Sequence, residues 1–192
     1  MLMSRAGADV VVLERHPGIG GRSATIAHNG FRFDRGPTFF LYPQVLRKIF
    51  AACGRALDRE VELIRLNPMY RLVFEDSGSL AATADLQQMA SEIAKLNPAD
   101  ARQLPRLMDD NRKKLESFRP VLETPFLGWT SLLAPKLLKS LPWLRPHRSV
   151  DADLASYFQD PRVRLAFSFQ SKYLGMSPFK CPSLFTILSF LE

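Results

Sequence analysis

The sequence predicts a mixed α/β or α+β fold, and three observations carry that prediction. Strand-like and helix-like segments alternate along the first half of the chain, which is typical of a sheet covered by helices rather than of a helical bundle. Residues 10–13 (VVVL) form an apolar, β-branched run of the kind found in buried parallel strands. Residues 85–192 are mostly helix-like, and a chain of 192 residues that is 46% hydrophobic can bury a core.

The chain opens with the expected end of a helix. Residues 1–6 are predicted as its last turns, with Gly7 where a left-handed residue commonly caps a helix. The buried strand over 10–13 follows, and a glycine-rich loop comes after it at Gly18, Gly20 and Gly21. A strand that ends in an acid and then a Gly-Gly-Arg turn looks like the second strand of a dinucleotide-binding unit.

Two β-hairpins are expected, each formed by two short runs that flank a turn containing glycine. The paired runs are 23–27 with 31–34, around Asn29-Gly30, and 69–75 with 79–82, across residues 76–78.

Helices are predicted where proline, aspartate or asparagine precedes a periodic apolar pattern. The expected ranges are 43–53, 85–96, 98–118, 151–157 and a helix that starts at Asp160-Pro161.

Residues 125–144 (PFLGWTSLLAPKLLKSLPWL) differ in composition from the rest of the chain. Phe, Trp and Leu dominate, two lysines interrupt the run, and there is no acidic residue between Thr124 and Val150. Such a segment can lie in a membrane interface, where lysines reach the headgroups while leucines enter the acyl boundary. A pair of core helices broken by Pro135 and Pro142 explains the pattern equally well.

Composition excludes several classes of function. The formal charge of +7 and the pI near 9.7 are compatible with nucleic acid, an anionic membrane or a solvated basic face. Lys and Arg follow no nucleic-acid-binding pattern, so nucleic acid is not expected. Three histidines and two cysteines lack ligand spacing, so we expect neither a metal nor a disulfide. There is no spanning segment of about 18 apolar residues and no signal peptide, so we expect a cytoplasmic protein, free or on a membrane face.

The residues after the first strand suit a dinucleotide. Glu14 ends the strand, where an acid can accept hydrogen bonds from ribose hydroxyls, although a charged residue is also an ordinary way to end a strand. Gly20 and Gly21 allow backbone amides to approach a pyrophosphate, and Arg22 can neutralise it. A solvent-exposed turn is the alternative explanation for Gly-Gly-Arg.

The stretch ADVVVLERHPGIGGRSATIAHNGFRFDRGPT resembles the FAD-dependent carotenoid desaturases of the bacterial phytoene desaturase type, within the wider amine oxidase group. The order V-x-V-L-E, G-G-R, G-F-x-F-D-x-G-P-T carries the resemblance, and DPRVRLAFSFQSKYLGMSPF extends it into the second half. The matching positions are Glu14, Gly20, Gly21, Arg22, Gly30, Phe31, Phe33, Asp34, Gly36, Pro37 and Thr38.

The resemblance implies FAD as cofactor and a polyisoprenoid hydrocarbon as substrate. Hydride transfer to the flavin and loss of a proton from the neighbouring carbon would form a new C=C bond. The implied FAD contacts are Glu14, Gly20, Gly21, Arg22, Gly36, Pro37 and Thr38. Asp34 and Arg35 are candidates near the flavin, although a structural loop held by Gly36-Pro37 explains them as well. Arg148 and Asp151 are candidates for the substrate entrance, or an ordinary ion pair at a helix start.

The same resemblance suggests the domain organisation. Residues 1–84 are expected to form a partial, Rossmann-like FAD-binding domain, and residues 85–192 a largely helical substrate domain. Within the latter, 125–148 is a candidate membrane-interface segment, because a lipid-soluble substrate requires contact with the bilayer. We therefore expect a cytoplasmic enzyme that is peripheral on the membrane.

The chain departs from the family pattern at both ends. Family members begin with a strand and a G-x-G-x-x-G turn that delivers a helix N-terminus to the pyrophosphate, and they continue well beyond LSFLE. The chain is therefore expected to be an internal fragment. Two alternatives remain open: a related flavoenzyme that isomerises or saturates a polyene or oxidises an amine, and an inactive truncated product. The sequence predicts no oligomeric state.

Overall fold

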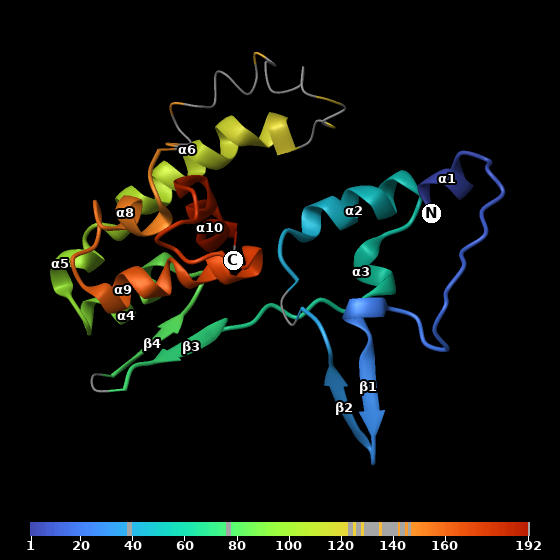
Figure 1. Ribbon diagram of the computed structural model, residues 1–192, viewed down its shortest axis with the longest axis horizontal. Helices are drawn as coiled ribbons and strands as arrows, with labels where there is room; N and C mark the ends of the chain where they lie inside the picture. Colours follow the sequence, from blue (N-terminus) through green and yellow to red (C-terminus); the bar gives the residue numbers. More distant parts are fainter. Residues whose placement is uncertain are drawn as a thin grey trace. The chain divides into compact units, whose positions relative to one another are not determined.

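The computed structural model describes residues 1–37, 40–75, 78–122, 125, 128, 135, 142, 145 and 147–191. Its elements group into two compact units, Met1–Ile64 and Arg65–Glu192 (Figure 1). Helices and strands both occur, as the predicted mixed fold requires. A compact unit is not in itself a functional domain, so the domain boundary expected between residues 84 and 85 stays a prediction.

The first unit consists of short elements around one antiparallel hairpin. They are α1 (Leu2–Arg5), η1 (Gly21–Ser23), β1 (Thr25–His28), β2 (Phe31–Asp34), α2 (Pro43–Ala52) and α3 (Leu57–Glu60). In the hairpin Thr25 lies opposite Asp34 and His28 lies opposite Phe31.

Local sequence signals set the ends of these elements. Asn29 and Gly30 have φ angles of 50° and 82°, the left-handed values that a two-residue hairpin turn of this kind requires. Gly7 follows α1 with a φ of 88°, and Pro43 stands in the first turn of α2. The predicted first hairpin, the helix end at residues 1–6 and the helix from Pro43 are confirmed.

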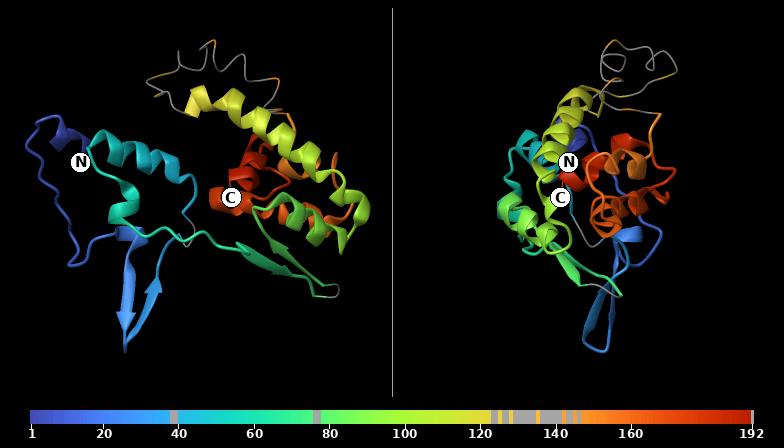
Figure 2. Two further views of the ribbon diagram at one scale, coloured as in Figure 1. Left: turned by 180° about the vertical axis from the view of Figure 1, so that it is seen from behind. Right: turned by 90° about the vertical axis from the view of Figure 1, so that its left-hand side faces the viewer.

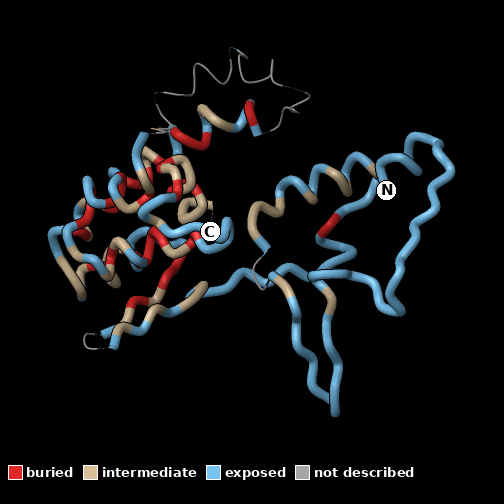
Figure 3. The backbone as a smooth tube through the Cα atoms, viewed as in Figure 1, coloured by how far each residue is buried: buried red, intermediate tan, exposed pale blue. Residues whose placement is uncertain are grey.

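The strand expected over residues 10–13 is not formed, which corrects the sequence prediction. The four side chains are 39%, 75%, 86% and 90% exposed, and no described residue pairs with this run. A parallel strand needs hydrogen-bonded neighbours and helices over its faces, and the first unit supplies neither. Among its described residues only Leu57 is buried (Figure 3).

The second unit combines a hairpin with a group of helices. The elements are β3 (Tyr70–Val73), β4 (Ser79–Ala82), α4 (Leu86–Ala94), α5 (Pro98–Ala101), α6 (Leu104–Leu122), α8 (Val150–Leu154), α9 (Pro161–Ala166), η3 (Phe169–Leu174), η4 (Ser183–Ile187) and α10 (Leu188–Leu191). The hairpin, the helix capped by Asp85 and the helix start at Pro161 are confirmed. The last helix was expected to include Phe167 and Phe169, but α9 ends at Ala166 and Phe169 begins η3. The Asp85 side chain accepts hydrogen bonds from the amides of Gln87 and Gln88.

One predicted helix is in fact two. The range expected as a single helix over 98–118 divides into α5 and α6. Pro105 explains the break, because proline lacks the amide that a continuous helix would use and its ring clashes with the carbonyl one turn earlier.

The buried Asp100 carboxylate on α5 accepts hydrogen bonds from the amides of Gln159 and Asp160, at 2.9 and 2.8 Å.

The core of the second unit lies between the hairpin and the helices. Leu80, Ile93, Leu107, Leu154 and Phe158 are completely buried there. In Figure 2 the long helix α6 crosses the C-terminal elements, and it packs against α4, η4 and α10. This packing fixes the faces of α6 that carry the polar groups described below.

Candidate functional site

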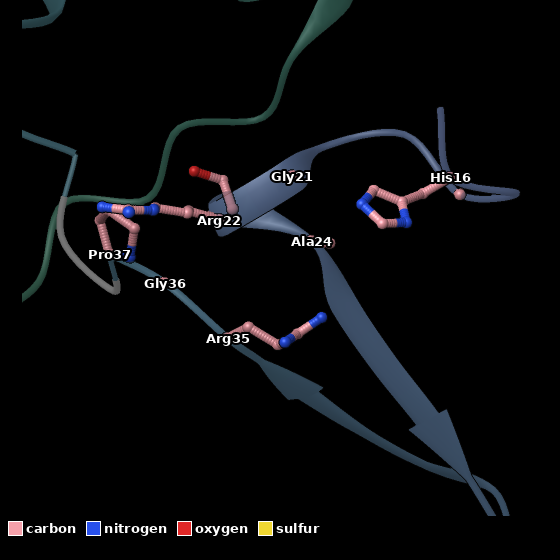
Figure 4. A pocket seen from close by; sticks show the side chains of 9 residues that line it. His16, Gly21, Arg22, Ala24, Arg35, Gly36 and Pro37 are labelled. Carbon is pink, nitrogen blue, oxygen red and sulfur yellow. The ribbon is translucent and has the colours of Figure 1, made fainter. Parts of the chain in front are cut away.

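A cleft in the first unit has a volume of about 750 Å³. Two segments line it, the glycine-rich loop that ends in β1 and the residues that follow β2 (Figure 4). The lining residues are His16, Gly18, Gly21, Arg22, Ser23, Ala24, Arg35, Gly36 and Pro37.

The glycine-rich loop turns sharply because two glycines take left-handed backbone angles. Gly20 and Gly21 have φ values of 111° and 52°, which side chains disfavour. The turn closes through hydrogen bonds from the amides of Ser23 and Ala24 to the carbonyls of Gly20 and Gly21, at 2.8 and 3.2 Å. No protein atom lies within 4 Å of the point where a Gly21 side chain would begin, so the backbone there is open to a ligand.

The second segment packs directly on the first at Gly36. A Cβ atom on Gly36 would stand 2.1 Å from the carbonyl oxygen of Arg22 and 3.2 Å from the Cα of Ser23. Since real Cβ atoms essentially never approach another atom within 3.0 Å, only glycine fits here. The amide of Arg35 donates to the carbonyl of Ala24 at 3.0 Å and extends the hairpin pairing to the edge of the cleft.

The cleft is positively charged. Arg22 and Arg35 are exposed, and within the described residues neither guanidinium has a carboxylate partner. Figure 4 shows the Arg22 side chain extending toward Pro37, while Arg35 leaves the strand that leads to Gly36. Two exposed guanidinium groups beside an open glycine backbone could hold an anion such as a pyrophosphate.

The other described residues predicted to contact the cofactor or to lie near the flavin are not among the residues that line the cleft. Glu14 accepts a hydrogen bond from the amide of His16 at 2.9 Å and does not line the cleft. Asp34 accepts one from the Thr25 hydroxyl at 2.8 Å, across the hairpin. Gly20 shapes the turn, and Thr38 lies outside the described residues. Their expected roles toward a cofactor stay predictions.

Sequence reasoning missed His16 as a residue of this cleft. It was considered only as a metal ligand, and among the described residues no group of His, Cys, Asp and Glu could hold a metal ion. The sequence position of His16, between Glu14 and the glycine-rich loop, could have indicated that it lies near this loop.

The two candidates for the substrate entrance lie in the second unit and have different partners. The Arg148 guanidinium is 3.9 Å from a carboxylate oxygen of Asp153, and the Asp151 carboxylate is 3.7 Å from Nε of Arg164. The simple ion pair between Arg148 and Asp151 that the sequence offered as an alternative is therefore not formed. Their role at an entrance stays a prediction.

Asp153 is the centre of a buried polar cluster. Its carboxylate receives Lys114 Nζ at 2.5 Å, Arg145 at 2.8 Å and the Ser183 hydroxyl at 2.8 Å, and both Asp153 and Lys114 are at most 1% exposed. Burial by itself would raise the pKa of Asp153, but its contacts with Lys114 and Arg145 hold that pKa below its usual value.

Lys114, within this cluster, and Tyr157, beside it, also have shifted pKa values. Burial lowers the pKa of Lys114, and the contact with Asp153 offsets this only in part. Burial, followed by a hydrogen bond to Asp110, raises the pKa of Tyr157 to about 12. The cluster joins α6, α8 and η4, so its first effect is to fix these elements together.

Comparison with known proteins assigns the chain to a family. Residues 2–192 match the family model described as flavin containing amine oxidoreductase. The chain belongs to this family. A flavin cofactor is what this family implies.

Curated relatives of this family member include several desaturases. The chain is 40% identical over 192 residues to 4,4'-diapophytoene desaturase (4,4'-diapolycopene-forming) of Methylomonas sp, with 100% of the chain and 37% of the relative covered. It is 36% identical over 193 residues to phytoene desaturase of Cercospora nicotianae, covering 99% and 31%. With phytoene desaturase (lycopene-forming) of Pantoea ananas it shares 34% identity over 193 residues, covering 99% and 38%. The chain thus spans about a third of the length of these relatives.

Proposed function

We propose that the chain supplies part of the FAD site of a carotenoid desaturase that introduces C=C bonds into a polyisoprenoid hydrocarbon. The observation that carries this proposal is the cleft where Gly36 packs on Arg22, and which Gly21 and the guanidinium groups of Arg22 and Arg35 line without a carboxylate partner in the described part of the chain. The names of the relatives support the substrate class, since they act on phytoene or diapophytoene by name.

The residues of the cleft fit the pyrophosphate of FAD. A pyrophosphate diester carries two negative charges, which Arg22 and Arg35 match in number. The cleft volume of about 750 Å³ lies within the usual range of ligand sites, about 300–1,000 Å³. The backbone at Gly21 can approach the phosphate oxygens because no side chain intervenes.

The proposal gives Arg22, Arg35 and Gly36 of the cleft, and the neighbouring Asp34, separate roles. Arg22 and Arg35 bind the pyrophosphate, and Gly36 keeps the loop that leads from β2 close to the glycine turn. Asp34 is held by Thr25, so it positions this loop rather than exchanging protons. The flavin, when bound, supplies the hydride acceptor, and the protein has to orient the substrate carbon and exclude water.

Contact with a membrane follows from the substrate. A polyisoprenoid dissolves in lipid, so we propose that the enzyme is cytoplasmic and peripheral on the membrane. The segment 125–148 is the candidate contact; most of it, including Trp129 and Trp143, lies outside the described residues. No helix in the described ranges is long and apolar enough to cross a bilayer.

FAD binding tests the first part of the proposal. FAD is titrated into the purified protein and the quenching of its fluorescence is followed. Replacing both Arg22→Gln and Arg35→Gln should weaken binding about tenfold or more, since each removes a charge-assisted hydrogen bond. The matched control is Arg32→Gln with Arg59→Gln, which removes the same charge from exposed positions of the first unit that do not line the cleft. Equal affinity of the two double variants would exclude the cleft as the FAD site.

Activity tests the second part. The flavin-loaded protein is incubated with phytoene in liposomes, and new visible absorption bands are followed. Their appearance supports desaturation, because each added double bond lengthens the conjugated system. The proposed reaction would be contradicted if phytoene gave neither flavin reduction nor new bands while an added amine reduced the flavin.

A further inference from the structure

The second unit contains another cavity, separate from the anion-binding cleft. Its volume is about 340 Å³, which is at the lower end of the range for small-molecule sites, about 300–1,000 Å³. The lining comes from the β3–β4 hairpin, the start of α4, one face of α6 and the end of α10. The lining residues are Arg65, Met69, Tyr70, Ala82, Thr83, Ala84, Leu86, Met89, Met108, Arg112, Phe167, Ser189, Phe190 and Leu191.

Most of this lining is apolar and adaptable. Met69, Met89 and Met108 are three of the six methionines of the chain, and Phe167 and Phe190 add aromatic surface. Methionine has three rotatable bonds and a polarisable sulfur, so it moulds itself to ligands of irregular shape. A lining of this kind suits a flexible hydrocarbon chain better than a rigid polar ligand.

The small polar groups of the lining are already satisfied within the protein. The Thr83 hydroxyl accepts a hydrogen bond from the Asp85 amide at 3.2 Å, and the Ser189 hydroxyl donates to the Thr186 carbonyl at 2.8 Å. The Tyr70 hydroxyl accepts from the side chain of Gln170 at 3.1 Å. None of these groups therefore requires a ligand.

Arg65 and Arg112, unlike these small polar groups, have charges that the described residues leave largely unmatched. Both are exposed, so their charge lies where the cavity meets solvent. Arg112 has one loose ion pair, 3.7 Å from the carboxylate of Asp109, which Lys113 contacts more closely at 2.6 Å. Arg65 has no ion pair among the described residues. Since both arginines line the cavity, a ligand that carries negative charge would suit it better than a neutral one.

We propose that this cavity binds an anionic amphiphile, a single hydrocarbon chain with a carboxylate or phosphate head group. The chain lies among the methionines and aromatic rings, and Arg65 and Arg112 hold the head group. Burial of the apolar chain supplies most of the affinity, while the guanidinium groups select the charged head. The ligand differs from the uncharged hydrocarbon of the proposed reaction, which would leave both arginines unmatched.

Displacement of a fluorescent fatty acid tests this proposal without any flavin. Dansyl-labelled undecanoate is bound to the purified protein and displaced by dodecanoate, dodecyl phosphate, dodecanol or squalene, each below its aggregation limit. We expect one or both anions to displace the probe at concentrations at least tenfold lower than dodecanol or squalene. A preference between the two anions identifies the head group as carboxylate or phosphate.

Three variants locate the site. Arg65→Gln with Arg112→Gln should weaken dodecanoate binding at least tenfold and leave dodecanol binding unchanged. Arg102→Gln with Arg119→Gln, which removes the same charge from exposed positions outside the lining, should change neither. Ala84→Phe, at an exposed lining position, should block the probe while circular dichroism shows an unchanged fold.

Two results would overturn the proposal. Squalene that competes as well as dodecanoate would make the cavity a hydrocarbon site. Dodecanoate binding that survives both the double arginine variant and Ala84→Phe would place the amphiphile elsewhere. FAD affinity and the desaturation assay are measured on the same variants, so this site and the proposed reaction can fail separately.

Discussion

Replacing Gly36→Ala is the sharpest perturbation of the anion-binding cleft. The new Cβ would start 2.1 Å from the Arg22 carbonyl oxygen, where contacts below 3.0 Å essentially never occur. The two segments must therefore separate by about 0.9 Å, the difference between these two distances. The atoms in the way belong to the backbone, so no side-chain rotation can relieve the clash.

This displacement acts on the residue that is expected to hold the pyrophosphate. At a catalytic site, misplacing a group by about 1 Å can lower the reaction rate roughly a hundredfold. Ligand affinity at an exposed loop that can relax should fall by less. We expect FAD affinity to fall about tenfold or more. The free energy of unfolding should fall by about 1–3 kcal/mol, the usual cost of overpacking, or by less if the loop moves freely.

The matched control is Gly18→Ala, in the same cleft. A Cβ on Gly18 would meet nothing within 4 Å, and its φ angle is not left-handed. Gly18→Ala should therefore leave FAD affinity within about twofold of the original protein, because neither strain nor a clash arises. Flavin fluorescence titration measures both variants. If Gly36→Ala bound FAD as tightly as Gly18→Ala, the close approach would have no part in the site.

The buried cluster around Asp153 gives the remaining predictions. Lys114→Met leaves the buried Asp153 carboxylate without its closest partner and should cost roughly 3–5 kcal/mol in urea unfolding. Lys114→Met combined with Asp153→Leu should cost less than the sum of the two single changes, and strict additivity would show that the pair is not coupled. The lowered pKa of Asp153 stabilises the fold above the ordinary aspartate pKa of about 3.9, and this contribution is lost as the pH falls through the folded-state value. Asp153→Asn should therefore flatten the acid side of the stability profile relative to the original protein, and parallel profiles would contradict the assignment.

Signals that act over a few residues predicted their elements well. Asn29-Gly30 fixes the first hairpin, Asp85 caps α4 and Pro161 starts α9, because each depends only on backbone angles or amides nearby. The break between α5 and α6 was equally local. Pro105 indicates this break in the sequence, and the prediction of a single helix over 98–118 did not take that residue into account.

Features that depend on distant partners were harder to predict. The run over 10–13 has the composition of a buried strand. A strand forms only where neighbouring strands pair with it, and composition does not show whether such neighbours are present. Asp153 contacts Lys114, 39 positions earlier, and Ser183, 30 positions later, and no periodicity in the sequence reveals such contacts. In the cleft the sequence identified Gly21, Arg22, Gly36 and Pro37 as site residues, and the structure brings them together.

The spacing between the Gly-Gly-Arg and Gly-Pro motifs follows from the hairpin that joins them. Thr25 pairs with Asp34, and the Arg35 amide continues the pairing to Ala24, so the next step along both strands brings Gly36 beside Ser23 and Arg22. One extra residue in the Asn29-Gly30 turn would shift this register and move Gly36 away from Arg22, even with every motif residue retained. The cleft therefore depends on the register of the hairpin as much as on its side chains, and this register requires a two-residue turn, a glycine at 36 and an intervening hairpin of fixed length.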